Sequence, residues 1–452
     1  MTVTTDVGRR SAPEDTGISV RTEPEPGTAA HVLRPLLVAM LGPDPAVRVE
    51  LWDGSAFGAG DPIGTIRVNR RDALRRMLWA PGELGLGRAY VAGDLDVDGD
   101  ILAILEVLRD APVRHAGPAE LAKMAAEVAK AAKELDAVGP PLPPPPEEAR
   151  PRGWRHSKAR DAEAISHHYD VGNDFYEIVL GPAMTYSCAR FATPGTSLED
   201  AQADKHELIC RKLGLHERPG QRLLDVGCGW GSMAMHAARH HGARVVGVTI
   251  SREQADYARR RVAEAGLEDR VEIRLQDYRD LGGERFDAIS SIGMFEHVGK
   301  AKTAEYFGVL RSLLGPHGRL LNHAISSVKG SRLPRRSFTY RYVFPDGELL
   351  DVADTVAAME EAGFEVRDVE SLREHYAQTL RHWVANLEAG WDRAVELVGE
   401  GRARVWRLYM AGSAVGFEDG GIAVHQVLGV VPDPSGTSGM PRTRDGWATG
   451  AG

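Results

Sequence analysis

The chain has 452 residues, of which 43% are hydrophobic, and a formal net charge of −9. This length favours two domains joined by linkers, and the hydrophobic share can fill a sizeable core. The acidic balance argues against a nucleic-acid-binding protein, which usually presents a net basic face. The three cysteines, Cys188, Cys210 and Cys228, follow neither a disulfide nor a metal-binding spacing. We therefore expect a reducing cytoplasm and no metal site.

The first part of the chain predicts a tail followed by a small α+β domain. Residues 1–30 are rich in Thr, Pro, Glu and Gly and lack the apolar stretch of a signal peptide, so we expect a disordered tail. Residues 31–112 form the predicted small domain, which shows no obvious catalytic constellation. Its apolar patterns predict an initial helix, strands over residues 47–52 and 64–68, and helices over residues 72–79 and 101–108.

A helix and a proline-rich spacer follow this domain. Apolar residues of the segment 118–138 share one helical face, which favours a packing helix over a membrane-surface helix. Residues 139–146 read GPPLPPPP, a sequence that is incompatible with a helix or a central strand. We therefore predict a linker over residues 113–150, a second domain over 151–432 and a flexible tail over 433–452.

A buried strand that runs into a glycine turn lies near the middle of the chain. Residues 223–231 read LLDVGCGWG, in which Gly227, Gly229 and Gly231 remove Cβ atoms where backbone amides must approach a ligand. The spacing is G-x-G-x-G instead of the G-x-G-x-x-G of a dinucleotide site, and Asp225 precedes the first glycine by two residues. This combination resembles motif I of S-adenosylmethionine (SAM)-dependent methyltransferases.

Three further strands are predicted after this motif, over residues 244–250, 271–275 and 286–291. Polar residues follow each strand, and in an open parallel sheet ligands bind beyond the carboxyl ends of the strands. We therefore expect an α/β fold with a Rossmann-like core of the class I SAM-dependent methyltransferase type.

Several blocks resemble the cyclopropane-fatty-acyl-phospholipid synthase family. The blocks are HYDVGNDFY at 168–176, MTYSCA at 184–189, GMFEHVG at 293–299, WRLY at 406–409 and, in the first domain, GLGRAY at 85–90. The similarity covers residues 164–430 and agrees with the family in order. It implies a SAM-dependent enzyme that acts on the cis double bond of an unsaturated acyl chain in a phospholipid.

The resemblance also implies the positions of the cofactor contacts. These are Tyr186, Ser187, Asp225, Gly227, Gly229, Gly231, Thr249, Gln254, Gln276 and Asp277. The glycines would lie at the methionine end of SAM, Thr249 and Gln254 by the ribose, and Gln276 and Asp277 by the adenine. Most methyltransferases have an acidic residue after the second strand, whereas this chain has Thr249 and Ser251 there, as the family does.

The chemistry of an alkene acceptor requires a base in a dry site. An alkene is a weak nucleophile, so the site must align it with the donor and exclude water from the carbocation. In the family the base is thought to be bound bicarbonate. The resemblance assigns its contacts to the side chains of Glu296, His323 and Tyr409 and to the backbones of Cys188 and Ile325.

Structural alternatives stand beside these roles. His323 alone is typical of a satisfied core histidine, Tyr409 of helix packing, and Cys188 of an inert buried thiol. An unpaired Glu296 after a buried strand would be costly, which favours function. Five aromatic residues fit either the acceptor site or the core: Tyr340, Phe344, His375, Tyr376 and Trp383.

Two products can arise from the same cation. Ring closure gives a cyclopropane, whereas a hydride shift before proton loss gives a methylene branch. The chain is most similar to the actinobacterial fatty-acid methyltransferases of the tuberculostearic acid route, which implies a 10-methylene product and a partner reductase. A cyclopropane synthase with the same residues is the alternative, and a non-catalytic protein that binds lipid or SAM is a remote one.

Two basic clusters suggest contact with an anionic membrane. One lies around Trp154 within residues 150–160, and the other lies within residues 329–341. Such charges can attract anionic lipids, although a solvated surface is the simpler interpretation. The longest apolar run, residues 32–41, is too short to span a bilayer. We expect a cytoplasmic protein that is peripheral on the inner face of the membrane, and a homodimer remains open.

Overall fold

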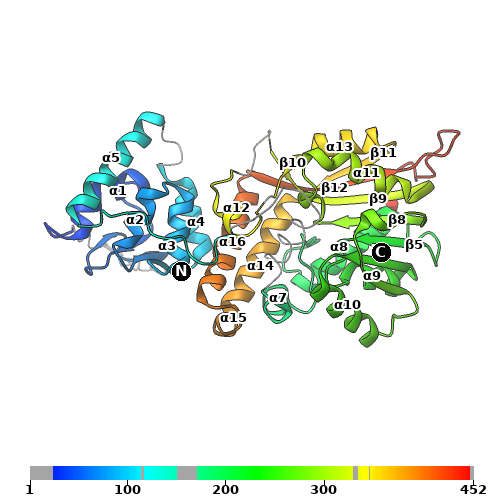
Figure 1. Cartoon of the computed structure of the whole chain (residues 1–452), viewed down its shortest axis with the longest axis horizontal. Helices are drawn as coiled ribbons and strands as arrows, with labels where there is room; N and C mark the ends of the chain where they lie inside the picture. The colour runs from blue at the N-terminus through cyan, green and yellow to red at the C-terminus, as the bar shows by residue number, and fades with distance from the viewer. Residues whose placement is uncertain (1–23, 113–116, 150–170, 329–333, 346, 448–452) are drawn as a thin grey trace, which may run out of the picture. The chain divides into compact units, whose positions relative to one another are not determined.

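The computed structural model describes residues 24–112, 117–149, 171–328, 334–345 and 347–447. Packing divides the described chain into two compact units (Figure 1). The first unit draws on Met1–Arg71 and Asp96–Val138, and the second on Asp72–Leu95 and Gly139–Gly452. These units differ from the predicted ranges because Asp72–Leu95 packs with the second unit. Which ranges fold independently stays a prediction.

The first unit is a small α+β module, as its sequence predicts. Its elements are α1 (Ala29–Leu41), β1 (Arg48–Glu50), β2 (Ala56–Gly58), β3 (Gly64–Val68), β4 (Leu95–Gly99), α4 (Ile101–Asp110) and α5 (Pro118–Glu134). The sheet order is β2-β1-β3-β4, and α5 contacts α1. The side chain of Asp100 accepts hydrogen bonds from the amides of Leu102 and Ala103, which fixes the start of α4. The patterns missed the short strands β2 and β4.

Helices α2 (Asp72–Trp79) and α3 (Glu83–Val91) belong to the second unit because of specific contacts. A Cβ on Gly87 would lie 2.4 Å from the ring of Phe338, so glycine allows the close approach of α12 (Phe338–Tyr342). Arg88 pairs with the buried Glu148 at 2.7 Å. Glu148 also accepts a hydrogen bond from Arg341, a member of the second predicted basic cluster. The GLGRAY block thus holds the residue that follows the proline-rich segment, whereas Arg76 on α2 donates to the carbonyl of Pro143 within that segment at 2.9 Å.

The second unit is built on an eight-stranded sheet. The strands are β5 (Arg222–Val226), β6 (Arg244–Thr249), β7 (Val271–Leu275), β8 (Phe286–Ile292), β9 (Leu314–Ser327), β10 (Leu350–Asp351), β11 (Glu365–Ser371) and β12 (Ile422–Val430). Seven strands follow the order β11-β12-β9-β8-β5-β6-β7, and β10 pairs with β9. Strands β5 to β9 are parallel, which confirms the predicted α/β sheet, whereas β12 runs antiparallel to β9 and β11.

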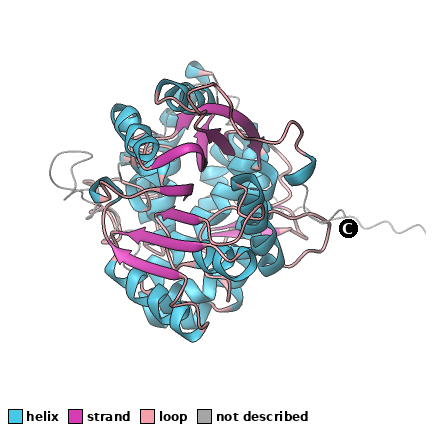
Figure 2. Cartoon of the chain, turned by 90° about the vertical axis from the view of Figure 1, so that its right-hand side faces the viewer, coloured by secondary structure: helices cyan, strands magenta, loops and turns pink. Residues whose placement is uncertain are grey.

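Helices cover both faces of this sheet (Figures 1 and 2). The α-helices not yet given are α7 (Asn173–Leu180), α8 (Leu198–Leu213), α9 (Ser232–His241), α10 (Arg252–Glu264), α11 (Thr303–Ser312), α13 (Val352–Glu361), α14 (Arg373–Ala389), α15 (Trp391–Val398) and α16 (Glu400–Glu418). Short 3-10 helices are η2 (Tyr278–Asp280), η3 (Phe295–His297), η4 (Lys300–Lys302) and η5 (Asp445–Trp447).

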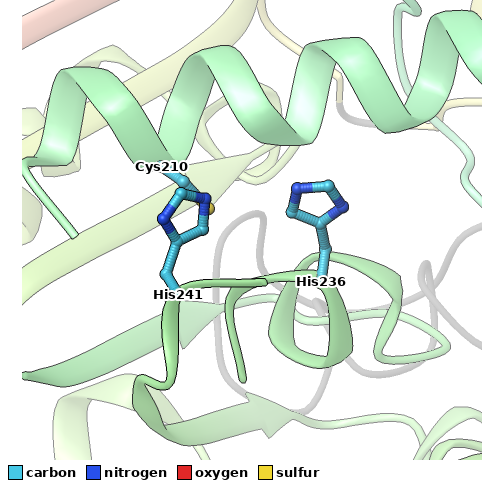
Figure 3. A group of neighbouring side chains, drawn as sticks. All are labelled: Cys210, His236 and His241. Atoms are coloured by element: carbon cyan, nitrogen blue, oxygen red, sulfur yellow. The ribbon is translucent and has the colours of Figure 1, made fainter. Parts of the chain in front are cut away.

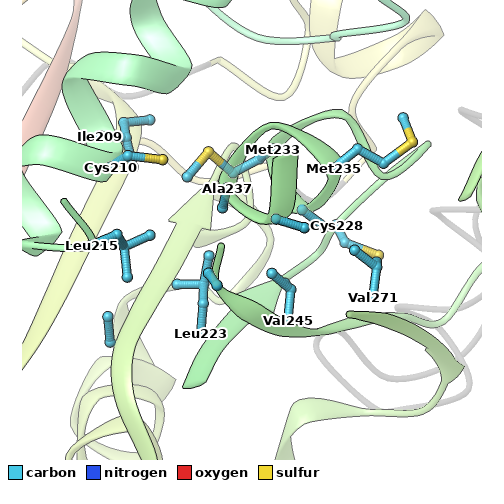
Figure 4. Packing of buried hydrophobic residues seen from close by; sticks show 14 of the residues in the cluster. Ile209, Cys210, Leu215, Leu223, Cys228, Met233, Met235, Ala237, Val245 and Val271 are labelled. Atoms are coloured by element: carbon cyan, nitrogen blue, oxygen red, sulfur yellow. The ribbon is translucent and has the colours of Figure 1, made fainter. Parts of the chain in front are cut away.

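Alternation along β5 divides the core between the two faces of the sheet. Leu223 packs with residues of α8, α9 and α10 in one cluster (Figure 4). Leu224 and Val226 pack with residues of α11 and α13 in the other cluster. A parallel strand that is buried on both faces needs a nearly continuous apolar run, and this explains why Asp225 is the only charged residue between Leu223 and Val226.

The described part of the predicted carboxyl-terminal tail is packed. Trp447 is buried in the cluster of α8, α9 and α10, and Arg444 pairs with Asp368 at 2.9 Å. The indole of Trp447 and the ion pair of Arg444 thus contact the second unit, and the flexibility of the tail stays a prediction. None of the described helices is long and apolar enough to cross a bilayer. The basic cluster at residues 150–160 lies outside the described residues.

Candidate active site

The predicted site residues gather at one edge of the large sheet. The chain passes from β5 outward to β6 and β7 and then returns to β8 on the other side of β5. The strand order therefore reverses between β5 and β8, which is where open α/β sheets bind ligands. The segments after these two strands also lie together, since a Cβ on Gly227 would be 3.5 Å from Met294.

The glycine loop after β5 has a backbone that only glycine adopts freely. Gly227, Gly229 and Gly231 have φ values of 71°, 53° and 82°. The amides of Gly227 and Cys228 donate to the carbonyl of Val248 on β6, which fixes the loop. Beyond its two chain neighbours, no described residue has an atom within 4 Å of an ideal Cβ on Gly229. The loop thus leaves open space beside Gly229, directly before α9 begins.

Asp225, near the end of β5, is buried in the sheet. Its side chain accepts a hydrogen bond from Ser290 Oγ at 2.7 Å, and burial raises the pKa of its carboxyl to about 6. Lys205 on α8 is also completely buried, and its Nζ donates to Ser187 Oγ at 2.9 Å. Burial lowers the pKa of Lys205 to about 7, and the charge of Asp225 opposes this shift.

The ends of β6 and β7 are joined by hydrogen bonds. Thr249 Oγ1 donates to Gln254 Oε1 at 2.9 Å, and both residues are buried. The amide of Gln276 donates to the carbonyl of Thr249. Asp277 accepts from the amide of Arg279 at the start of η2 and pairs with its guanidinium at 2.6 Å. These four predicted contacts therefore lie along adjacent strand ends, with preordered side chains.

The segment that contains Tyr186 and Ser187 is held from two helices. Gln202 Nε2 on α8 donates to the carbonyl of Ser187 at 2.9 Å. On α14, Thr379 Oγ1 accepts from the amide of Ala189. The ring of Tyr186 stacks on Trp383 with centroids 5.2 Å apart. The backbone and the ring of this segment are thus fixed independently.

Glu296 lies after β8 and reaches across to β9. Its Oε1 accepts a hydrogen bond from the amide of Ile325 at 2.7 Å. Its Oε2 is buried and has no hydrogen-bond partner among the residues that the structure describes. Burial raises the pKa of this carboxyl to about 7. Glu296 is therefore a poorly compensated carboxyl, as its position after a buried strand predicts.

His323 lies on β9 beside the end of β8, where its register partner is Ile292. Its Nδ1 is 3.3 Å from Gln426 Nε2, while its buried Nε2 has no hydrogen-bond partner within the described chain. Burial lowers the pKa of His323 well below its usual value, so the imidazole is neutral. With Gln426 as donor to Nδ1, the ring proton resides on Nε2.

Aromatic rings connect the glycine loop with the region of Glu296. The contacts run from Trp230 through Tyr176, Tyr186, Trp406, Tyr409 and Phe344 to His297, with ring centroids 4.7 to 6.0 Å apart. Burial raises the pKa of Tyr409 to about 12, and the charge of Glu296 adds to this shift. Tyr409 is therefore a protonated phenol near Glu296.

Some of the predicted catalytic residues are in direct contact, whereas others only lie on the same strand or in a neighbouring segment. Glu296 and Ile325 are directly bonded, and His323 lies two residues before Ile325 on the same strand. Cys188 lies in the segment held by α8 and α14, and its thiol contacts the carbonyl of Ala189. Burial raises the pKa of that thiol, so it is inert at neutral pH. The catalytic roles of these residues stay predictions.

The sequence interpretation missed Lys205 and Trp230. Helical periodicity puts Lys205 on the same face as Leu198, Gln202 and Ile209, all of which are buried. That signal was available, but a lysine within an amphipathic helix is usually solvated. Trp230 lies inside the glycine motif, and its indole donates to Asn173 at 2.7 Å.

Comparison with known proteins shows that this chain is similar to members of one family. The family model described as mycolic acid cyclopropane synthetase matches residues 156–427. A probable fatty acid methyltransferase of Mycobacterium tuberculosis is 46% identical over 86% of this chain and 92% of its own length. The tuberculostearic acid methyltransferase UfaA1 of the same organism is 34% identical over 84% of this chain and 86% of its own length.

Two further proteins extend the comparison. The cyclopropane-fatty-acyl-phospholipid synthase of Escherichia coli is 36% identical over 82% of this chain and 88% of its own length. The crystal structure of mycolic acid cyclopropane synthase CmaA1, complexed with SAH and CTAB, is 34% identical, with a TM-score of 0.56. It covers 59% of this chain and 97% of the crystallised chain.

The chain therefore belongs to the mycolic acid cyclopropane synthetase family. It is a SAM-dependent methyltransferase of a family that acts on lipids. The resemblance of the sequence blocks to this family and the predicted Rossmann-like fold are confirmed.

Proposed function

We propose that this chain methylates the cis double bond of an oleoyl-like acyl chain in a phospholipid and forms a methylene-branched product. The observation that carries the proposal is a pair of buried polar atoms, Glu296 Oε2 and His323 Nε2, without hydrogen-bond partners in the described chain. An unmade hydrogen bond on a buried group costs about 1–3 kcal/mol. Two such groups at the ligand-binding edge of the sheet favour a polar ligand between them.

Residues around the glycine loop fit SAM. The open space beside Gly229 and the start of α9 suit a group that must approach the backbone closely. Thr249 and Gln254 would hold the ribose side, and Gln276 and Asp277 the adenine. The bound cofactor supplies an electrophilic methyl group. The fixed segment of Tyr186 and Ser187 would orient it toward the aromatic rings.

The aromatic rings suit the acyl chain. Tyr186, Trp406, Tyr409 and Phe344 form successive ring contacts and offer apolar surface for the alkene. A cation held over such π faces gains about 0.5–2 kcal/mol. The same rings exclude water, which would otherwise capture the cation.

The polar atoms beside these rings fit bicarbonate, a small oxyanion that carries one hydroxyl group. His323 Nε2–H can donate to one oxygen, and Glu296 Oε2 can accept from the hydroxyl. Tyr409 offers a further protonated donor, since its pKa is about 12. Bound bicarbonate supplies a base that takes the proton lost from the substrate cation. The turnover rate should therefore fall in bicarbonate-depleted buffer. It should recover when bicarbonate is added.

Expression in a bacterium without its own cyclopropane synthase tests the product. The cells are fed oleate, and lipid fatty acids are analysed by mass spectrometry with derivatisation that locates double bonds. A chain with one added carbon and a methylene branch supports the proposal. A ring-bearing isomer of the same mass supports the second candidate, cyclopropane synthesis, which the Escherichia coli relative favours. No added carbon would point to a non-catalytic lipid- or SAM-binding protein.

An enzyme that acts on a phospholipid must reach its substrate at a membrane surface. We extend the proposal to peripheral binding on the inner face of the membrane, to a partner reductase that saturates the methylene product, and to a homodimer. Arg335 and Arg336 are exposed in the described part of the second basic cluster. Flotation with vesicles of anionic lipid tests the binding, and Arg335→Gln with Arg336→Gln should weaken it. Equal flotation of both proteins would exclude these arginines as membrane contacts.

A further inference from the structure

Three potential metal ligands converge between α8 and α9, and none of them is among the residues assigned to methyl transfer. Cys210 projects from α8 toward the imidazoles of His236 and His241 on α9 (Figure 3). One ligand atom from each residue lies within 4.8 Å of the other two. Glu207, almost one turn before Cys210 on α8, has its Oε2 2.8 Å from His241 Nε2 and 3.4 Å from His236 Nε2.

We propose that Cys210, His236 and His241 bind a zinc-type transition-metal ion, with Glu207 as the fourth ligand. A thiolate, two imidazoles and a carboxylate form a donor set that zinc accepts in tetrahedral geometry. Magnesium and calcium prefer oxygen donors and fit this set poorly. The cysteine spacing gave no sign of such a site because its ligands come from two helices that meet only in the fold.

The position of the site favours a structural role for the metal. Cys210 is fully buried, and the side chains of His241 and His236 are 7% and 12% exposed. A site of four protein ligands without an open position is typical of structural zinc. The ion would fasten α9, which begins at the glycine loop, to α8, which carries Lys205. This role does not depend on the proposed lipid chemistry.

The surrounding contacts already orient the ligands. Arg211 Nε donates to Glu207 Oε1 at 2.7 Å, so the guanidinium holds the oxygen that does not face the histidines. Donor atoms of tetrahedral zinc lie about 3.3–3.8 Å apart, given metal–ligand distances of about 2.0–2.3 Å. The three ligand atoms therefore need to close by roughly 1 Å, which side-chain rotation supplies. Zinc must also replace the hydrogen bonds between Glu207 and the two imidazoles.

Those hydrogen bonds provide the competing explanation, in which Glu207 alone organises the histidines. Chelator-treated full-length protein separates the two explanations. Zinc chloride is added, free metal is removed by dialysis, and bound zinc is measured by mass spectrometry. Cobalt chloride provides a second probe, because thiolate–cobalt charge transfer and tetrahedral d–d bands report the ligands directly. We expect one zinc per chain, the cobalt bands, and a rise of several degrees in the thermal midpoint on zinc addition.

Two neighbouring histidines provide a matched pair of variants. His241→Gln keeps a side-chain donor for Glu207 at the end of α9 and should weaken zinc binding at least 100-fold. His240→Gln removes an exposed histidine whose ring lies 4.5 Å from that of His236 but supplies no ligand, and this variant should bind zinc like the wild-type chain. Cys210→Ser should lose the cobalt charge-transfer band. The proposal is overturned if the wild-type chain retains neither metal after dialysis, or if His241→Gln and His240→Gln retain equal zinc.

Discussion

The sheet edge and the α8–α9 cluster use the same side-chain types in opposite ways. At the edge, Glu296 Oε2 and His323 Nε2 are buried without partners among the described residues. In the cluster, Glu207 bonds to both His236 and His241. Unmet hydrogen bonds on buried atoms cost stability and are typical of a site that receives a ligand. A cluster with internal hydrogen bonds is ordered before a ligand arrives, so a metal there would add stability to an existing arrangement.

The two glutamates show this contrast in their pKa values. Burial raises the pKa of Glu296 to about 7, with only backbone hydrogen bonds opposing the shift. Burial also acts on Glu207, but hydrogen bonds from Arg211 and His241 outweigh it and lower the pKa to about 2. Burial alone therefore does not mark a functional carboxyl. Burial without a cationic partner is the stronger indication of function, because the carboxyl can then exchange a proton near neutral pH.

Removing the charge at the sheet edge should have the largest effect. Glu296→Gln keeps an acceptor for the Ile325 amide but cannot accept from a ligand hydroxyl with a carboxylate. We expect turnover to fall about 10²- to 10⁴-fold, the range for loss of acid–base function. Calorimetric titration should show SAM affinity within twofold of the wild-type value. Glu268→Gln, at an exposed position, is the control. Turnover above half of the wild-type rate would remove Glu296 from the mechanism.

Filling the space in the glycine loop should have the next largest effect. Gly229→Val places a side chain where no described atom beyond the chain neighbours of Gly229 lies within 4 Å, so any clash is expected with a bound cofactor and not with the protein. We expect SAM affinity to fall by more than about 100-fold, or about 2.7 kcal/mol. Gly266→Val is the matched control, because Gly266 also has a positive φ, 63°, and open space. Equal SAM affinity in both variants would place the cofactor elsewhere.

The local patterns of the sequence predicted the core of this edge well. Strand β7 has the predicted bounds, and β5 and β8 differ by one residue at one end. Apolar runs and apolar alternation are local signals, so the positions of these strands can be predicted from the sequence, whereas the function of the glycines stays a prediction. Glu296 was predicted as functional because a carboxyl directly after a buried strand is costly.

The features that the sequence did not predict depend on contacts between segments that are distant along the chain. Periodicity along α8 indicates a buried face, but it does not show that Lys205 meets Ser187 or that Cys210 meets His241. The reversed direction of β12 and the packing of Asp72–Leu95 with the second unit also arise from tertiary pairing. Spacing rules for metal sites search short stretches of chain, whereas Cys210 and His236 come from different helices.

Two buried lysines on α8 sharpen the contrast between positioning and stability. Lys205 donates to Ser187 Oγ, whereas Lys212 pairs with Asp368 at 2.8 Å and with Glu370. Lys205→Met should release the segment of predicted SAM contacts and raise KM for SAM about 10-fold, with a smaller change in kcat. Lys212→Met breaks a buried ion pair, which costs about 3–5 kcal/mol, and should lower the thermal midpoint without changing KM at a permissive temperature.

Steady-state kinetics and thermal unfolding on both variants test this separation. An unchanged KM for SAM in Lys205→Met would mean that Lys205 contributes only to packing. A KM change in Lys212→Met equal to that in Lys205→Met would show a general effect of disturbing α8, and would exclude Lys205 as a positioning residue.

The smallest effect should be a pH-dependent gain in stability when Glu296 is neutralised. The folded chain binds a proton at Glu296 with a pKa of about 7, against a usual value of 4.5. Its stabilising contribution is complete below pH 4.5 and is lost as the pH rises through 7, by at most about 3 kcal/mol. Glu296→Gln avoids this loss, so its thermal midpoint should exceed that of the wild-type chain by a few degrees at pH 8 and match it near pH 4.5. Glu268→Gln should show no such trend. A Glu296→Gln chain that is less stable than the wild type at pH 8 would mean that the carboxylate is compensated, and that the contrast with Glu207 is incorrect.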